Sequence, residues 1–290
     1  MSAAPVLDTL PMTLPRLAEK KRLGEPIVMV TAYDHPSARV ADAAAVDLVL
    51  VGDSAANVVL GYDSTVPVSV DELIMLGAAV RRGLRTPLMI SDMPFGSYEA
   101  SNELAIGNAQ RFVKEAGADA VKLEGGGIMV DRARAIVQSG IPVMGHVGLT
   151  PQTATALGGY KAQGRTADAA HRVAADALAL QDAGCFSIVF EAIPAAVSEE
   201  LMPRIDESVV IGIGAGPATD GQVLVFHDLL GIREGAGARF VKRYGDLMDE
   251  MIQGVTAYAD DVREHRYPAS EHTYSIDPGE LADFRARLAA

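Results

Sequence analysis

Residues 114–124 read Lys-Glu-Ala-Gly-Ala-Asp-Ala-Val-Lys-Leu-Glu, and this stretch decides the fold. Gly117 marks a helix end, because a glycine just past a helix adopts the left-handed conformation that other residues resist. The run from Ala120 to Leu123 is apolar except at Lys122, and Glu124 follows it. Nearly continuous apolar runs are typical of parallel strands that are buried on both faces. The stretch therefore predicts a helix, a tight turn and a buried parallel strand.

The same unit recurs along the chain, with a glycine between a helical segment and an apolar run at residues 83, 140 and 184 as well. Candidate strands begin near Ile27, Asp47, Pro87, Ala120, Ile141, Phe186, Val209 and Val223. Eight strands that alternate with helices predict an α/β fold, the (β/α)8 TIM barrel. On pattern alone, a doubly wound open sheet stays as the alternative.

No change in composition divides the region from Pro26 to His265, and 290 residues suit one large α/β domain. We expect an N-terminal arm at 1–24, helical around Leu14–Arg22, a catalytic barrel at 25–265 and a polar tail at 266–290. A short helix is expected after Gly279. Residues 1–14 lack a basic segment followed by an apolar run, so no secretory signal is expected.

The charge and cysteine content narrow the classes of function. The formal net charge of −13 disfavours phosphate backbones and anionic lipid as partners, so we expect neither nucleic acid nor membrane. The single cysteine, Cys185, excludes an intramolecular disulfide and a multi-cysteine metal cluster. A reducing, cytoplasmic location is the simplest expectation. No apolar stretch approaches the length that spans a bilayer.

Polar and ionisable residues lie where five consecutive predicted strands end. In chain order they are Asp53, Ser54, Asp92, Lys122, Glu124, His146 and Glu191. A single aspartate at such a place is usually a helix cap or a loop residue. Five successive strands that end in this way are harder to explain as caps, and buried charges are rarely left unpaired. Because catalytic groups of a barrel converge at the carboxyl ends of its strands, the pattern predicts one active site.

The residue types suggest a metal and an anionic ligand. Asp53, Asp92 and Glu124 offer hard oxygen ligands without cysteines, which suits Mg²⁺ better than zinc. Lys122 is suited to bind a substrate carboxylate or phosphate, or forms an ion pair with Glu124 inside the barrel. His146 is a candidate proton carrier or ligand, with a structural histidine as an equal alternative.

Other interpretations stay open from the residues alone. Gly212-Ile213-Gly214-Ala215-Gly216 is a weak dinucleotide motif, and it suits a tight turn better than a phosphate site. Gly52-Asp53-Ser54 is similar to a serine-hydrolase block, with Asp168 and His171 as an acid and base pair. That rival fits badly, because Asp168 and His171 fall in a helical stretch. A metabolite-binding protein without catalysis is a third class.

The motifs together resemble the ketopantoate hydroxymethyltransferase (3-methyl-2-oxobutanoate hydroxymethyltransferase) family over nearly the whole chain. The similar blocks are Thr31-Ala32-Tyr33-Asp34, Val51-Gly52-Asp53-Ser54, Gly61-Tyr62-Asp63-Ser64-Thr65, Asp92-Met93-Pro94-Phe95, Val121-Lys122-Leu123-Glu124-Gly125-Gly126, Gly145-His146-Val147-Gly148-Leu149-Thr150-Pro151-Gln152, Phe190-Glu191 and Glu271-His272-Thr273. Residues after about Tyr274 extend past the usual end of the family.

The resemblance implies a Mg²⁺-dependent transferase of pantothenate (coenzyme A) biosynthesis with a (β/α)8 barrel. Such enzymes move a hydroxymethyl group from 5,10-methylenetetrahydrofolate to 3-methyl-2-oxobutanoate, forming 2-dehydropantoate through a Mg-stabilised enolate. It also implies a homo-oligomer, commonly a homodecamer.

By resemblance, each site residue receives a role. Asp53 and Asp92 match metal ligands, with Glu124 completing the metal environment partly through water. Asp53, Ser54, Asp92 and Lys122 match contacts to the keto acid. Glu191 matches the general base, and His146 matches a catalytic-site histidine near the reacting group. A 2-keto acid can chelate Mg²⁺ through two oxygens, which suits enolate formation. No motif indicates where the folate binds.

Overall fold

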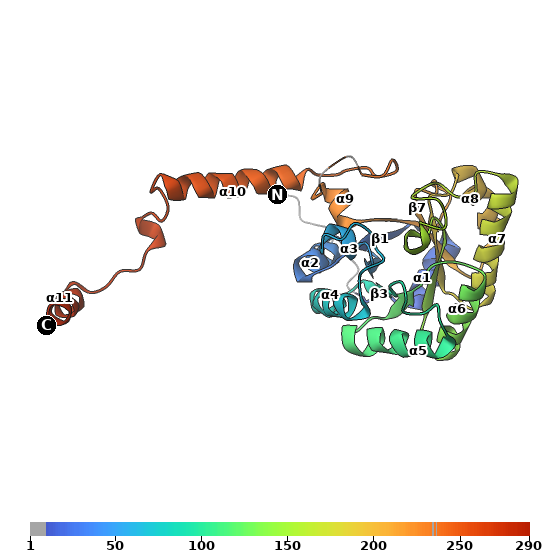
Figure 1. Cartoon of the computed structure of the whole chain (residues 1–290), viewed down its shortest axis with the longest axis horizontal. Coiled ribbons are helices and arrows are strands. Elements are labelled where there is room, and N and C mark those ends of the chain that lie inside the picture. Colours follow the sequence, from blue (N-terminus) through green and yellow to red (C-terminus); the bar gives the residue numbers. More distant parts are fainter. Residues whose placement is uncertain (1–9, 234, 236) are drawn as a thin grey trace.

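Eight parallel strands form a closed barrel at the centre of the computed structural model, which describes residues 10–233, 235 and 237–290 (Figure 1). The strands are β1 Ile27–Thr31, β2 Leu48–Val51, β3 Leu88–Asp92, β4 Ala120–Lys122, β5 Val143–Gly148, β6 Ser187–Glu191, β7 Val209–Ile213 and β8 Gly221–Leu224. Each strand pairs with the next in chain order, and β8 pairs with β1. The predicted TIM barrel is therefore confirmed, and the open sheet is wrong.

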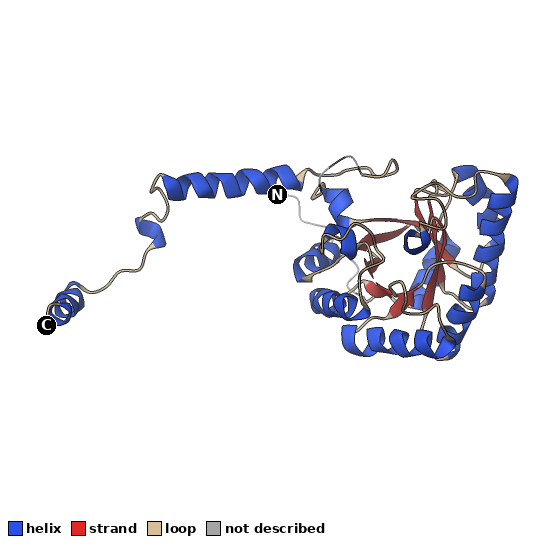
Figure 2. Cartoon of the chain, viewed as in Figure 1, coloured by secondary structure: helices blue, strands red, loops and turns tan. Residues whose placement is uncertain are grey.

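Helices surround most of the barrel (Figure 2). They are α1 Leu14–Leu23, α2 His35–Ala43, α3 Ala55–Val58, α4 Val70–Gly83, α5 Asn102–Arg111, α6 Ile128–Gln138, α7 Ala167–Asp182, α8 Ala195–Leu201, α9 Phe226–Leu230, α10 Leu247–Arg263 and α11 Pro278–Leu288. A π-helical turn, Phe112–Ala116, continues α5, and three 3-10 turns lie at Pro151–Thr153, Met202–Arg204 and Ser270–His272.

The glycines that follow helices behave as predicted at three of four positions. Gly117, Gly140 and Gly184 have φ angles of 74°, 93° and 91°, the left-handed values of a helix end. Gly83 also marks a helix end, as the last residue of α4, but the predicted left-handed conformation is wrong there, and its successor is extended. A Cβ at residue 83 would lie 2.6 Å from the Ala38 Cβ atom of α2. Gly83 therefore permits close packing of two helices rather than a turn.

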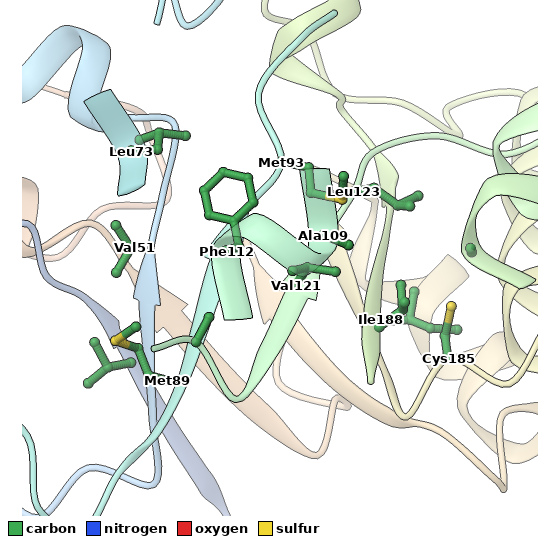
Figure 3. Packing of buried hydrophobic residues seen from close by; sticks show 14 of the residues in the cluster. Val51, Leu73, Met89, Met93, Ala109, Phe112, Val121, Leu123, Cys185 and Ile188 are labelled. Atoms are coloured by element: carbon green, nitrogen blue, oxygen red, sulfur yellow. The ribbon is translucent and has the colours of Figure 1, made fainter. Parts of the chain in front are cut away.

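Apolar side chains fill two layers, one inside the barrel and one between the strands and the helices. Leu48, Ile90 and Ile211 belong to the inner layer. The outer layer includes Phe112 and Val121, and Figure 3 shows both residues with other side chains of this layer. Burial on both faces explains why these strands read as continuous apolar runs.

Helix α1 closes the amino-terminal end of the barrel. Leu17 is 1% exposed and packs with the inner layer. Lys21 Nζ donates to the carbonyl oxygens of Ile205 and Ser208 and forms an ion pair with Asp220 at 2.9 Å. Because this end is closed, the interior is accessible from the carboxyl ends of the strands.

The chain after the barrel takes a different course. Helix α10 projects away from the barrel, and the carboxyl-terminal helix α11 lies beyond it (Figure 1). The helix expected after Gly279 is confirmed as α11. The division into arm, barrel and tail stays a prediction, and residues 1–9 of the arm lie outside the described residues. Of the described helices, none combines the length and the apolar character needed to cross a membrane.

Candidate active site

A cavity of about 900 Å³ opens at the carboxyl ends of the strands. All seven residues that the sequence singled out contribute to its wall, namely Asp53, Ser54, Asp92, Lys122, Glu124, His146 and Glu191. Each lies in or directly after one of the strands β2 to β6, so parallel strands bring residues far apart in sequence to one place. The predicted convergence is present in the structure.

The loop after β2 places Asp53 against Asp92. The backbone N–H of Asp53 donates to Asp92 Oδ2 at 2.9 Å. A Cβ on the preceding Gly52 would lie 2.7 Å from Ser54 Oγ, so glycine is needed for this close turn. Ser54 Oγ lies 2.8 Å from the hydroxyl oxygen of Tyr33, which is fully buried. The turn after β2 thus places the Asp53 carboxyl group and the Ser54 hydroxyl group in the wall of the cavity.

Lys122 is the central cation of the site. Its Nζ lies 2.9 Å from Asp92 Oδ1, 3.1 Å from His146 Nδ1 and 3.8 Å from Glu124 Oε1, and the residue is 3% exposed. Burial alone would lower the pKa of Lys122, but the charges of Asp92, Glu124 and Asp53 outweigh burial and raise it. The ion pair expected with Glu124 is therefore secondary to the one with Asp92. Both ion pairs of Lys122 are compatible with its binding a substrate anion.

His146 connects Lys122 to Glu191. The ammonium group of Lys122 can only donate a hydrogen bond. His146 Nδ1 therefore accepts it, and the proton of the imidazole ring is on Nε2. That Nε2 atom lies 3.2 Å from Glu191 Oε2. Burial, followed by the positive charge of Lys122, holds the pKa of His146 well below its usual value. His146 is thus a neutral imidazole whose Nε2 lies beside Glu191 but makes no hydrogen bond to the described residues.

The pKa values of three carboxyl groups in the site are raised, whereas the pKa of His146 is lowered. Burial, together with the negative charge of Asp92, raises the pKa of Asp53 to about 7. Burial also raises the pKa of Glu191 to about 7 and places the pKa of Glu124 well above its usual value. The site therefore concentrates more negative charge than Lys122 can balance.

This excess of negative charge fits a divalent cation. Asp53, Asp92 and Glu124 supply hard oxygen donors. Asp92 Oδ1 is buried and accepts no hydrogen bond from the described residues, although it forms an ion pair with Lys122. Within the described part of the chain, no three histidine, cysteine or acidic side chains are grouped so that they could hold a metal ion by themselves. Mg²⁺ is usually held by only one or two carboxylates, with water and substrate as further ligands, so an open set of donors suits it.

The serine-hydrolase pair does not form at this cavity, whereas the glycine motif contributes Ile213 and Gly214 to its wall. Asp168 and His171 lie on the outer helix α7 and contribute nothing to the cavity wall. Gly214 and Gly216 have φ angles of 64° and 83°, and a Cβ on Gly214 would lie 2.5 Å from the Phe240 ring. The glycine motif is therefore a tight turn after β7, as expected.

Sequence reasoning missed two residues that support the carboxylates from behind. Gln152 is buried and hydrogen-bonded to the carboxyl groups of Asp53 and Glu124, and the buried Tyr98 donates to Gln152. Neither residue is charged, so strand-end patterns do not reveal them. Tyr160 and Lys161, which line the cavity, were also not singled out as site residues. Gln152 does belong to the long block at 145–152, and this block is the signal in the sequence that points to it.

The sequence matches one protein family over most of its length. The family profile described as "Ketopantoate hydroxymethyltransferase" matches residues 11–270. The 3-methyl-2-oxobutanoate hydroxymethyltransferase of Moorella thermoacetica is 50% identical over 263 residues, which cover 91% of this chain and 97% of that relative. The enzyme of the same description from Heliobacterium modesticaldum is 49% identical over 266 residues, which cover 92% and 96%.

Solved structures with the same fold are more distant in sequence. A 2,3-dimethylmalate lyase, a member of the PEP mutase/isocitrate lyase superfamily, superposes with a TM-score of 0.57 at 14% identity, covering 94% of this chain and 98% of that chain. A phosphonopyruvate hydrolase, solved as a complex with oxalate and Mg²⁺, gives 0.54 at 13% identity, covering 96% and 98%. At these identities the similarity concerns the fold alone.

Proposed function

The chain belongs to the ketopantoate hydroxymethyltransferase family, and from this premise we propose how its site performs the reaction. The proposed substrates are 3-methyl-2-oxobutanoate and 5,10-methylenetetrahydrofolate, and the product is 2-dehydropantoate for pantothenate biosynthesis. The observation that carries the proposal is the convergence of four carboxyl groups, Lys122 and His146 on one cavity. The proposal keeps the expected cytoplasmic location, which suits a free, buried Cys185.

Lys122 and Ser54 orient the keto acid in this proposal. Lys122 is a buried cation that a substrate carboxylate can approach from the cavity, and the Ser54 hydroxyl adds a hydrogen bond. Two such contacts restrict the rotation of a small substrate, so that its C3–H bond faces a single base.

Asp53, Asp92 and Glu124 are the residues that would hold Mg²⁺. When bound there, Mg²⁺ supplies Lewis-acid stabilisation of negative charge that develops on the keto oxygen. The phosphonopyruvate hydrolase of the same fold was solved with oxalate and Mg²⁺, which agrees with this part of the proposal.

Glu191 is the general base. The C3–H bond breaks, its proton passes to a carboxylate oxygen of Glu191, and the released electron pair forms the new bond to the one-carbon unit of the folate. Water adds to the methylene bridge of the folate, both C–N bonds of the bridge break, and tetrahydrofolate leaves with the protons of the water. The one-carbon unit thus reacts at the level of formaldehyde, and its oxygen takes up the proton from Glu191 to become the hydroxyl group. Burial raises the pKa of Glu191 to about 7, which strengthens it as a base near neutral pH. His146 Nε2 lies 3.2 Å from Glu191 Oε2, so the imidazole packs directly against this carboxyl group.

We further propose a homo-oligomer, with the decamer that the family resemblance implies as the expected size. The supporting observation is that no residue of α10 is buried, although Met251, Val255, Tyr258 and Val262 share one face of it. A second copy of the chain is the partner proposed for this face.

Product formation tests the reaction directly. The purified chain is incubated with both substrates and Mg²⁺, and 2-dehydropantoate is measured by mass spectrometry. We expect product that requires both the folate and the divalent cation. Product formed equally without the folate would contradict the proposed donor, and ester hydrolysis without metal would favour the rejected hydrolase.

A further inference from the structure

Gln152 lies directly behind the acidic wall of the cavity. It is 4% exposed and sits in the 3-10 turn Pro151–Thr153, which follows β5. Asp53 and Glu124 line the cavity, but Gln152 and Tyr98 do not. Gln152 therefore cannot act on a ligand except through the residues in front of it.

The amide of Gln152 connects the ends of several strands. Its Nε2 donates to Asp53 Oδ2 at 2.9 Å and to the carbonyl oxygen of Met93 at 3.0 Å, which uses both of its protons. Its backbone N–H donates to Glu124 Oε2 at 3.1 Å. One residue thus holds one oxygen of each of two buried carboxyl groups.

Tyr98 fixes which way the amide faces. The Tyr98 hydroxyl, 2% exposed, donates to Gln152 Oε1 at 2.6 Å and accepts from the backbone N–H of Glu124 at 3.2 Å. A flipped amide would place its oxygen against the Asp53 carboxyl group and the Met93 carbonyl, where acceptor would face acceptor. The orientation is therefore fixed by chemistry at both ends of the side chain.

The remaining oxygens of the two carboxyl groups are less engaged. The described residues offer no hydrogen bond to Asp53 Oδ1, whereas Glu124 Oε1 lies 3.8 Å from Lys122 Nζ and 3.5 Å from His146 Nδ1. Side chains that hold one face of a ligating group and leave the other face available are common around metal sites.

We propose that Gln152, with Tyr98 behind it, is a positioning residue that orients Asp53 and Glu124 toward a divalent cation. The inference rests on the proposed function, since it assigns a role toward the metal of that site. Loss of such a supporting residue usually weakens metal binding by about tenfold to a hundredfold, because the ligands must then be ordered by the metal itself.

The test compares Mg²⁺ binding in three variants of the full chain. Gln152→Leu keeps the approximate volume but removes the hydrogen bonds of the amide, and Tyr98→Phe removes only the hydroxyl. Gln181→Leu is the matched control, because Gln181 is also a buried glutamine that accepts from two backbone N–H groups, but it lies on α7 away from the cavity. Calorimetric titration with Mg²⁺ alone gives the affinity, and differential scanning calorimetry gives the melting temperature.

We expect Mg²⁺ affinity to fall about tenfold or more in Gln152→Leu, less in Tyr98→Phe, and not at all in Gln181→Leu. Excess Mg²⁺ should restore much of the turnover of Gln152→Leu, which a purely structural defect would not permit. If Gln152→Leu does not fold, Tyr98→Phe decides the question alone. Parent-like affinity in the folded variants, or an equal loss in the control, would overturn the inference. A parent chain that binds no Mg²⁺ would overturn the metal site itself, and this inference with it.

Discussion

Glu191 combines two properties that a base for a weakly acidic C–H bond needs. It lies at the end of β6, within reach of the cavity, and burial raises its pKa to about 7 from the usual 4.5. His146, 3.2 Å away, has a lowered pKa and is neutral, so it adds no positive charge beside this carboxyl group. The same surroundings that disfavour the charged carboxylate therefore make it a stronger base once it is deprotonated.

The raised pKa of Glu191 predicts how proton abstraction depends on pH. Only the deprotonated form accepts a proton, so the rate of C3 proton exchange, measured with Mg²⁺ present, should rise with pH to a midpoint no higher than about 7. A bound divalent cation favours the carboxylate and should move the midpoint to lower pH. Exchange followed by NMR between about pH 5.5 and about pH 8 checks this. A flat profile over that range would contradict the assignment of the base.

Lys122 should have opposite effects on the two ligands of the site. Lys122→Met removes the cation that we expect to bind the substrate carboxylate, so affinity for the keto acid should fall by about tenfold or more. The same change removes a positive charge beside Asp92 and Glu124, so Mg²⁺ alone should bind more tightly. Titration calorimetry with each ligand separately measures both. Unchanged affinity for the keto acid would assign Lys122 to the ion pair alone.

At the scale of single elements, the strands were predictable and one helix end was not. All eight strands begin within two residues of the expected positions, because burial on both faces leaves an apolar run in the sequence. Gly83 looked like the other glycines at helix ends, yet it serves the contact of α4 with α2. Close packing between helices depends on a partner distant in sequence, so the local pattern could not reveal it.

The packing at Gly83 leads to a stability prediction. Gly83→Ala should lower the free energy of unfolding by about 1–3 kcal/mol, because the new methyl group would overlap Ala38. Gly107→Ala on α5 is the matched control, because nothing lies within 4 Å of the added methyl group. It should stabilise the chain by up to about 1 kcal/mol through helix propensity. Urea unfolding measures both changes, and equal effects of the two substitutions would contradict the packing argument.

The charged members of the site were predictable for the same reason as the strands, since parallel strands bring their carboxyl ends together. Gln152 and Tyr98 were not, because an uncharged amide and a tyrosine in loops give no signal of periodicity or charge. Their role appears only when hydrogen bonds to Asp53 and Glu124 are seen in three dimensions.

At the scale of the whole molecule, α10 is the part that the sequence did not anticipate. The amphipathic pattern of α10 is typical of a helix that packs one face against another surface. The pattern does not show where that other surface lies. In the structure α10 projects from the barrel, and Val255 is 68% exposed (Figure 1). On the outer side of the barrel, Val28 of β1 is 51% exposed as well. Both observations support assembly with further copies of the chain.

Assembly through α10 can be tested with a pair of substitutions of equal charge. Val255→Glu places a carboxylate on the apolar face that holds Met251 and Tyr258, whereas Gln253→Glu adds the same charge on the opposite face. We expect Val255→Glu to reduce the oligomer to smaller species in light scattering, and Gln253→Glu to leave it intact. An unchanged oligomer in both variants would exclude this face as the interface.

The most direct test of the account is the exchange of the C3 proton of 3-methyl-2-oxobutanoate in D2O, with Mg²⁺ present and folate absent. We expect exchange by the parent chain, because proton removal precedes the transfer of the one-carbon unit. In Glu191→Gln, which is nearly isosteric but accepts no proton, exchange should collapse while the keto acid and Mg²⁺ still bind. Exchange at the parent rate in this variant would contradict the account and turn attention to His146.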